Sequence, residues 1–492
     1  MSAAAAQLGD RARSALRRGV RTARSLVAEL GVSQPTLSRA LRTLGADLVP
    51  FGGGRSIQYA LRDATRQDLQ APVYRVSAAG HLQELGTLVP VHPEGFVMVQ
   101  TDGARLHTEG LPWWLFDMRP QGYLGRAYNL QHGARLGLPS RLTDWNDSHV
   151  LRALLQRGDD LPGNLLIGDA ARDLFVNAPA PQPIDQASKA QAYATLAAAA
   201  ARGELHGSSA GGEQPKFTTY AQRESGPAHV IVKFTALTDT PVSERWRDLL
   251  MAEHLALEVL HDHGVPAARS AVIDHGTQRF LEVCRFDREG PLGRRALFSV
   301  QALDAEFAGT AGHWPQVVRA LVRDGVVAHP ALEQTEVLWA FGTLIANTDM
   351  HGGNLSFMAE HGRPYQLAPA YDMTCMAFAP TSGGDLPVRE LPLSINNEVA
   401  ASAWQKALPM AADFVERLRG NDCLSAGFAP CLEALTARID AARSRIARLA
   451  DFDARCDASL AAYERTGISV PSDTVLSKLE AKIAARVKQL HK

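Results

Sequence analysis

The sequence predicts an α+β fold with two lobes, a small β-rich lobe followed by a large helical lobe, and a short helical module in front of them. Three observations carry this prediction. Apolar and polar residues alternate with the period of strands from residue 72 to about 126, and strand-like runs return between 216 and 287. From residue 296 onward the apolar spacing is mainly helical. The first 62 residues differ from both regions in being strongly basic.

Length and composition limit the classes of protein to which the chain can belong. With 492 residues, 46% apolar and 21% charged, it has the composition of a globular protein of about two to four domains. No apolar run approaches the roughly 18 to 20 residues of a membrane span. The first residues lack the apolar core of a secretory signal, so a cytoplasmic protein without membrane contact is expected. The five cysteines form no C-x-x-C pair, which predicts reduced thiols and argues against a zinc site.

Residues 1–65 are predicted to form a basic N-terminal domain. The first 62 residues carry ten arginines against three acidic residues, a net charge of +7, although the whole chain has a net charge of -1. Residues 22–30 and 34–44 have helical spacing, and a tight turn ending in the N-cap Ser33 joins them. This is the helix-turn-helix pattern. Residues 48–61, with a glycine-rich centre, predict a hairpin that would serve as the wing of a winged helix.

The second of these helices presents side chains suited to base edges and phosphates in a DNA major groove. Together with the arginine of the hairpin turn they are Gln34, Thr36, Ser38, Arg39, Arg42 and Arg55. DNA is therefore a predicted partner, with nucleoid association as a consequence. One copy of the domain would bind weakly, so a homodimer on two half-sites is one expectation. The alternative is a helical bundle that contacts proteins and whose arginines are only solvated.

Residues 72–200 are predicted to form a second domain. Its first half reads as strands between glycine and proline turns, and residues 141–200 read as helices with a proline-rich break. Between them Trp113, Trp114 and Phe116 stand close together. Large aromatic side chains dominate core burial, so we expect this segment to pack in a core rather than to bind a ligand.

Residues 201–295 are predicted to form the small lobe. A segment rich in small residues, SSAGGEQPKF from Ser208, could cover phosphates with its amide groups, although a plain surface turn fits as well. Lys233 lies within an apolar strand. On local grounds an outward-facing lysine on an edge strand is favoured, since a buried one needs an anionic partner. Glu253 lies in the middle of a helix at residues 244–263, where it could face solvent or pair with that lysine.

The polar residues of the large lobe, residues 296–492, gather in one stretch. Asp349 and Asn354 follow an apolar helix, and Asp372 follows the next apolar segment. The spacing D-x-x-x-x-N is that of the protein-kinase catalytic loop, with Asn347-Thr348 in place of the usual His-Arg. In phosphoryl transfer one Asp accepts the proton of the attacking hydroxyl, while an Asn and an Asp hold Mg²⁺ against the phosphates. The alternative is a polar loop whose side chains cap turns. At the end of the chain, residues 472–492 read as an amphipathic helix with a basic end, expected to be packed or frayed rather than membrane-bound.

The motifs SSAGGEQPKF, VKF, CRFDR, NTDMHGGN and LAPAYDM, in this order, resemble the HipA-like family of bacterial serine/threonine kinases, toxins of toxin–antitoxin modules. The resemblance covers roughly residues 73 to 450 and implies a protein-kinase-like fold that uses ATP and Mg²⁺. It assigns Asp349 as catalytic base and Asn354 and Asp372 as metal ligands. It also implies a nucleotide site formed by Ser209, Ala210, Gly211, Gly212, Lys233, Glu253 and His351.

The same resemblance implies autophosphorylation at Ser209, or at the adjacent Ser208, which switches such kinases off. The usual family toxin leaves DNA binding to a separate antitoxin, whereas here a basic module is fused to the N-terminus, as in a subgroup of stand-alone relatives. We therefore expect a serine/threonine protein kinase that phosphorylates a cellular protein and itself and that binds DNA. A DNA-binding regulator with a catalytically silent nucleotide-binding fold is the alternative, and a small-molecule or nucleic-acid acceptor is a third reading.

Overall fold

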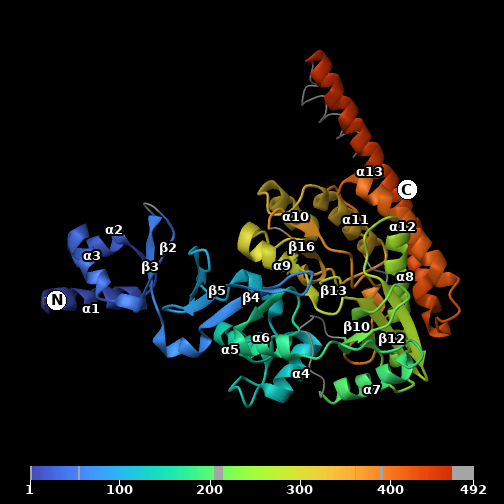
Figure 1. Ribbon diagram of the computed structural model, residues 1–492. Helices are drawn as coiled ribbons and strands as arrows, with labels where there is room; N and C mark the ends of the chain where they lie inside the picture. Colours follow the sequence, from blue (N-terminus) through green and yellow to red (C-terminus); the bar gives the residue numbers. More distant parts are fainter. Residues whose placement is uncertain (1–2, 54–55, 204–213, 361, 388–391, 468–492) are drawn as a thin grey trace.

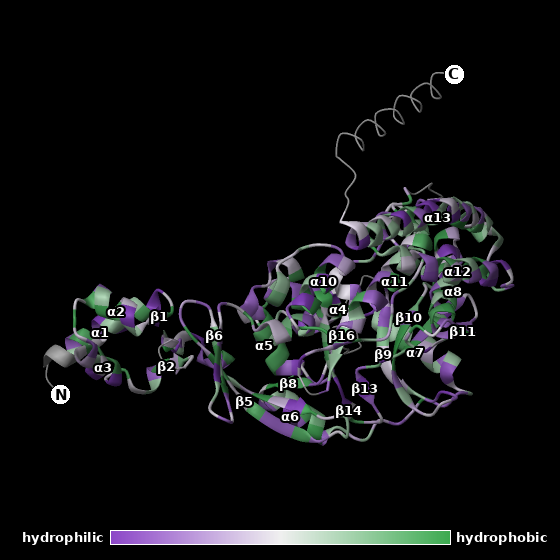
Figure 2. Cartoon of the chain, turned by 90° about the horizontal axis from the view of Figure 1, so that it is seen from above, coloured by the Kyte–Doolittle hydropathy of each residue, from purple (hydrophilic) through white to green (hydrophobic). Residues whose placement is uncertain are grey.

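The computed structural model describes residues 3–53, 56–203, 214–360, 362–387 and 392–467. The N-terminal helices lie at one end of the molecule in both views (Figures 1 and 2), and the last described helix projects from the body in Figure 1. Between them lie a middle domain and two further lobes. No helix within the described ranges is long and apolar enough to cross a membrane.

The N-terminal unit contains the expected helix pair and hairpin, together with a helix that precedes them. Leu16 of this first helix packs with Leu26 and Leu37 of the pair in one core. The N-cap Thr22 accepts a hydrogen bond from Ser25 N, and Gly31 ends the next helix in the left-handed conformation. The helices are α1 (Ala3–Arg17), α2 (Ala23–Leu30) and α3 (Gln34–Arg42), and the strands β1 (Arg21–Thr22), β2 (Leu48–Phe51) and β3 (Gln58–Leu61) form a sheet in the order β1–β3–β2.

The hairpin of the N-terminal unit packs directly against the middle domain. Phe51 stacks on His107 with ring centroids 4.8 Å apart, and Arg105 donates a hydrogen bond to the carbonyl of Pro50. Val49 shares an apolar cluster with Val97. Burial lowers the pKa of His107, which favours the neutral form of this stacked ring.

The middle domain is an antiparallel sheet in the order β7–β6–β5–β4–β8, with helices packed against it. The run at residues 165–167 was expected to be helical, but it forms an edge strand that pairs with β4, with Ile167 opposite Val73. A short apolar run fits the spacing of a helix and that of a strand equally well. Here it forms a strand because it can pair with the free edge of β4. The elements are β4 (Ala71–Val76), β5 (Leu82–Pro90), β6 (Phe96–Gln100), β7 (Arg105–Thr108), α4 (Gly122–His132), α5 (Asp147–Arg157), β8 (Leu165–Ile167) and α6 (Gly168–Asn177).

The aromatic segment at residues 113–118 packs in two cores, whereas the sequence predicted core packing without indicating this link between domains. Trp113 packs against Phe298 and Phe307 of the large lobe, with ring centroids 4.9 and 5.1 Å apart, and Trp114 packs in the middle domain. The carboxylate of Asp117 accepts a hydrogen bond of 2.6 Å from Ser299 N. The middle domain is thereby fixed to the large lobe.

The small lobe is a sheet in the order β11–β12–β10–β9 with a helix on each face. Phe280 packs with α7 on one face, and its neighbour Leu281 packs with α8 on the other. In β10, Val232 and Phe234 face α7, so Lys233 between them faces α8. The elements are α7 (Lys189–Ala201), β9 (Lys216–Ala221), β10 (Ala228–Phe234), α8 (Pro241–Asp262), β11 (Ser270–His275) and β12 (Gln278–Cys284).

The large lobe is mainly helical around the largest apolar core. It also contains a short sheet in the order β15–β16–β17. The elements are β13 (Arg288–Glu289), β14 (Gly293–Arg294), β15 (Ala296–Ser299), α9 (Val300–Leu303), α10 (Trp314–Arg323), α11 (Pro330–Leu344), β16 (Ser356–Ala359), β17 (Gln366–Leu367), α12 (Ala401–Arg419) and α13 (Ala429–Thr466).

A cluster of charged side chains, half-buried at Asp160 and buried at Arg285 and Asp287, holds the middle domain to the small lobe. Arg285 and Arg288 both contact Asp160, at 2.8 and 2.9 Å, and both contact Asp287. Asp287 also accepts a hydrogen bond from Gly163 N. The CRFDR motif therefore has a structural role here.

Candidate active site

The site is organised around a buried ion pair between β10 and α8. Lys233 Nζ lies 2.7 Å from each carboxylate oxygen of Glu253. The two residues are only 6% and 1% exposed. The local expectation of an outward-facing lysine on an edge strand is wrong: β10 is an inner strand, and its partner strands leave Lys233 facing α8. Helix α8 itself is held to the large lobe, because Asp248 accepts hydrogen bonds from Ser425 N and Oγ.

Asp372 brings a second carboxylate to Lys233 from the large lobe. It forms an ion pair with Lys233 and has a left-handed backbone with φ of 56°. Such a conformation is uncommon outside glycine, and it marks a point where the surroundings hold the chain under strain. Burial by itself would raise the pKa of Asp372, but Lys233 and Lys216 together lower it. Burial likewise opposes the charge of Lys233, yet Asp372 and Glu253 raise its pKa.

The loop that follows α11 places Asp349 beside this pair. Asn347 is buried, its side-chain oxygen accepts a hydrogen bond of 3.0 Å from Asp349 N, and its Nδ2 lies 3.4 Å from the carbonyl of Asp372. The side chain of Asp349 is 53% exposed and therefore open to a substrate. Burial of its inner part, together with the Asp372 carboxylate, raises the pKa of Asp349. Asn347 thus connects the two acidic loops, a role that its sequence position did not reveal.

Asn354 and His351 complete this loop. Asn354 Nδ2 donates a hydrogen bond of 2.9 Å to the carbonyl of Asp349, so the amide oxygen is the atom left for a cation. His351 Nδ1 accepts from Gly353 N, which leaves the proton on Nε2, 3.9 Å from Asp349 Oδ1. His351 therefore lies beside Asp349, the candidate base.

Tyr371 links the two metal-ligand candidates. Its hydroxyl donates a hydrogen bond of 2.7 Å to the carbonyl of Gly353, directly before Asn354, and accepts one from Ser356. Burial raises the pKa of Tyr371, so the hydroxyl stays protonated. Because Tyr371 also precedes Asp372, this hydrogen bond sets the spacing between Asn354 and Asp372.

Lys216 is a site residue that the sequence reasoning did not single out. It is 3% exposed and lies opposite Lys233 in the register of β9 and β10. Its charge lowers the pKa of Asp372 and acts on Asp349 in the same direction. One sequence feature could have pointed to Lys216: it is the first residue of the strand that follows the glycine-rich segment.

Several predicted residues lie away from this site or outside the described residues. Ser208, Ser209, Ala210, Gly211, Gly212 and Arg55 belong to the latter group. On α3, Gln34, Arg39 and Arg42 are exposed, and Thr36 and Ser38 are half-buried. Helix α3 lies far from α8 and α11, the helices beside the candidate site (Figure 1).

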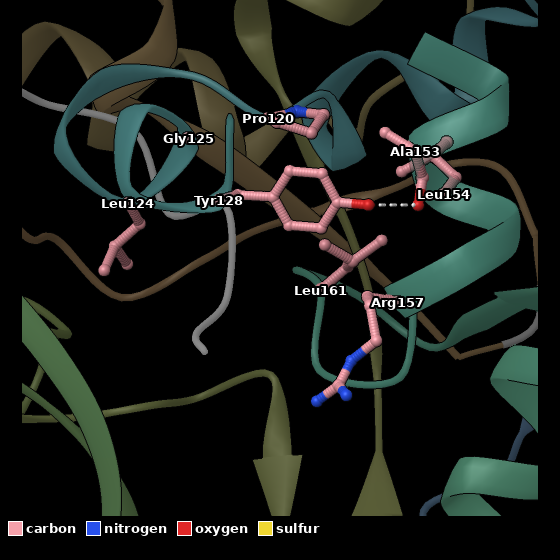
Figure 3. Close-up of a pocket in the computed structure, with 8 residues that line it drawn as sticks. All are labelled: Pro120, Leu124, Gly125, Tyr128, Ala153, Leu154, Arg157 and Leu161. Atoms are coloured by element: carbon pink, nitrogen blue, oxygen red, sulfur yellow. Dashed lines mark hydrogen bonds between the residues drawn. The ribbon is translucent and has the colours of Figure 1, made fainter. Parts of the chain in front are cut away.

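A small cavity elsewhere is too tight to bind a substrate. It lies between α4 and α5 and has a volume of about 10 Å³, room for one water at most. Tyr128 fills its centre and donates a hydrogen bond of 3.0 Å to the carbonyl of Ala153 (Figure 3). Burial raises the pKa of Tyr128 to about 12. This is a packing feature of the middle domain.

The donor set of the site fits a hard divalent cation. Asn354 and Asp372 offer one amide oxygen and one carboxylate, and Tyr371 fixes their spacing. Mg²⁺ is commonly held by one or two carboxylates together with substrate phosphates, and not by a full protein cage. The residues present therefore suit Mg²⁺ bound jointly with a nucleotide.

Two lobes, with a Lys–Glu pair in the small one and an Asp, Asn and Asp set in the large one, define a protein-kinase-like fold. Residues 67–176 match the model of the YjjJ-like toxin middle domain, and residues 208–444 match that of the HipA-like C-terminal domain. The chain is 40% identical to Toxin YjjJ of Escherichia coli (strain K12) over 438 residues, 88% of this chain and 98% of that protein. The chain belongs to the HipA-like toxin family, as the motifs predicted.

Two solved structures are also similar, at 15% identity each. One is the Helicobacter pylori proinflammatory kinase CtkA, with a TM-score of 0.37 over 49% of this chain and 93% of that one. The other is the Shewanella oneidensis MR-1 toxin–antitoxin complex of HipA, HipB and operator DNA, with a TM-score of 0.48 over 77% of this chain and 99% of that one.

Proposed function

We propose that this protein is an ATP- and Mg²⁺-dependent serine/threonine kinase of the toxin type, which phosphorylates a cellular protein and itself. The proposal rests mainly on the ion pairs that Lys233 forms with both Glu253 and Asp372. These three residues come from separate elements, and their assembly is the arrangement that phosphoryl transfer requires.

Each residue has a role that follows from its surroundings. Lys233, oriented by Glu253, would contact the nucleotide phosphates. Asp349 would accept the proton of the substrate hydroxyl, since its side chain is half exposed and its pKa is raised toward that of an effective base. Asn354 and Asp372 would hold Mg²⁺, which would neutralise phosphate charge.

We assign Ser209, or its neighbour Ser208, as the residue that the kinase modifies on itself. Ser209 precedes Lys216 by seven residues in the sequence. Lys216 lies beside Lys233 in the sheet. Seven residues of fully extended chain span at most about 23 Å, and this short separation in sequence supports the assignment.

The test is incubation of the purified protein with ATP and Mg²⁺, followed by mass spectrometry of the peptide that holds Ser208 and Ser209. Asp349→Asn is the test variant, and Asp324→Asn, an exposed aspartate elsewhere in the same lobe, is the matched control. We expect phosphate in the wild type and the control and none in Asp349→Asn. Phosphate in Asp349→Asn would reject Asp349 as the base.

Absence of phosphate in all three proteins, with ATP still bound, would favour the alternative function. That alternative is a DNA-binding transcriptional regulator with a silent nucleotide-binding fold. ATP turnover without serine phosphate would instead indicate a small-molecule or nucleic-acid acceptor.

We further propose that the N-terminal unit is a winged helix that binds DNA. Its support is the exposure of Gln34, Arg39 and Arg42 on α3, together with its net charge of +7. Since the hairpin is docked on the middle domain through Phe51 and His107, DNA would be held at a fixed position relative to the kinase lobes. Binding of a labelled duplex by the full chain, and its loss with rising salt, tests this part separately from phosphoryl transfer.

A further inference from the structure

The second half of α13 carries an apolar stripe that is exposed from Phe452 onward in the described part of the chain. Leu435, Ile439 and Ile446 of this helix are buried in the large-lobe core. The same helix face continues beyond them as Leu449, Phe452, Cys456, Leu460 and Tyr463. Phe452, Leu460 and Tyr463 are 56%, 58% and 51% exposed, and Figure 1 shows the helix projecting from the body there.

Residues 472–492 lie outside the described residues, but their sequence predicts a matching amphipathic helix. Ser472 is a suitable N-cap, and Asp473 follows it in the first turn. The spacing between successive apolar positions is 3, 4, 4 and 3 residues, the same as that of the stripe on α13. These positions are Leu476, Leu479, Ile483, Val487 and Leu490.

The connection between the two segments suits an antiparallel hairpin. Helix α13 ends at Gly467, which has a φ of 65° and donates its N–H to the carbonyl of Tyr463. Residues 467–471 remain for the turn, a usual length between antiparallel helices. Because the spacing is symmetric about this turn, folding back aligns the two stripes over their whole length. The pairs are Tyr463–Leu476, Leu460–Leu479, Cys456–Ile483, Phe452–Val487 and Leu449–Leu490.

The charges of the two segments agree with this register. Residues 451–466 carry four acidic and two basic residues, whereas residues 472–492 carry two acidic and five basic ones. In the same alignment Asp451 comes opposite Lys488, and Asp457 comes opposite Lys482. Pairing of two α13 helices from separate chains would bring like charges together, so the basic segment is the better occupant.

We propose that residues 472–492 fold back as a helix onto the exposed stripe of α13. The hairpin would extend the large lobe beyond residue 444, where the match to the HipA-like C-terminal domain ends. It would cover the apolar stripe within one chain and so keep that stripe from joining chains together.

Disulfide trapping tests the register. Cys456 is exposed and has no disulfide, and the proposal places it opposite Ile483. The full chain carrying Ile483→Cys and Cys423→Ser would be oxidised mildly at low protein concentration. The matched control is Ala485→Cys in the same background, since residue 485 lies on the opposite side of the predicted helix.

We expect an intrachain disulfide between positions 456 and 483, seen as a faster band without reductant and as a linked peptide in mass spectrometry. The control variant should form at least tenfold less of the corresponding product. Equal trapping in both variants, or trapping in neither, would overturn the proposal. A disulfide between two chains would also overturn it and would assign the stripe to a second copy.

Discussion

Lys233 Nζ is shared by two carboxylates, those of Glu253 and Asp372, and the contact with Asp372 joins the small lobe to the large lobe. Glu253 is 20 residues from Lys233 in the sequence, and Asp372 is 139 residues away. The charge of Lys233 is tolerated inside the protein because both partners are in place. Removal of one group therefore affects folding as well as activity.

Lys233→Met should destabilise the protein by about 3–5 kcal/mol, because the two carboxylates lose the cation that they share. Glu253→Gln should cost less, since Lys233 keeps Asp372. Urea unfolding measures both, with Lys406→Met as the control. Lys406 pairs with Glu333 at the surface, where solvent screens an ion pair so strongly that its loss should barely change stability. Equal losses for Lys233→Met and Lys406→Met would contradict the burial argument.

Tyr371→Phe should raise the Mg²⁺ concentration needed for half-maximal autophosphorylation by about tenfold, in the range typical of residues that orient metal ligands. The reason is that the lost hydroxyl no longer fixes Gly353, and with it Asn354, relative to Asp372. Tyr128→Phe removes a similar hydrogen bond in the middle domain and serves as the control. A lower maximal rate with an unchanged Mg²⁺ requirement would reject this positioning role.

The double variant Arg39→Ala, Arg42→Ala should weaken DNA binding and flatten its dependence on salt. Each lost phosphate contact should reduce the slope of log K against log salt by about 0.9. Fluorescence anisotropy of a labelled duplex at several salt concentrations measures this slope. Arg323→Ala, an exposed arginine on α10, should leave it unchanged. Phosphoryl transfer should be unaffected in both variants.

Asp287→Asn should weaken the charge cluster between the middle domain and the small lobe. It should therefore lower the free energy of unfolding by an amount that depends on pH. Burial would raise the pKa of Asp287, but Arg285 and Arg288 lower it to about 2 from the ordinary 3.8. The carboxylate therefore contributes stability that is complete above about pH 5 and is lost as the pH falls through about 2. Near pH 7 the variant should be less stable by about 3–5 kcal/mol.

The difference in free energy of unfolding between the wild type and Asp287→Asn should shrink steadily as the pH falls from about 5 toward 2. Urea unfolding midpoints of both proteins, measured across this pH range, show whether the difference shrinks or grows. Asp324→Asn, at an exposed surface position, should show no comparable loss. A gap that widens in acid would mean that the carboxyl group is protonated in the folded protein, contrary to its four hydrogen bonds with Arg285, Arg288 and Gly163.

The sequence by itself determined the order of the elements and the family. Strand and helix periods located β10, α8 and α11. The spacing of Asp349 and Asn354 predicted the candidate catalytic loop. These features are local, because periodicity and turn residues act over a few positions. The strand at residues 165–167 escaped this reasoning because a three-residue apolar run has no period of its own.

Only the tertiary structure decided which charged side chains are buried and with which partners. Local pattern placed Lys233 at the surface, since a lysine in a strand is normally exposed, and it gave no role to Lys216 or Asn347. Burial of a charge depends on counter-charges that are distant in the sequence, as Asp372 is from Lys233. Local sequence patterns do not reveal such distant partners, because only the folded chain brings them within hydrogen-bonding distance.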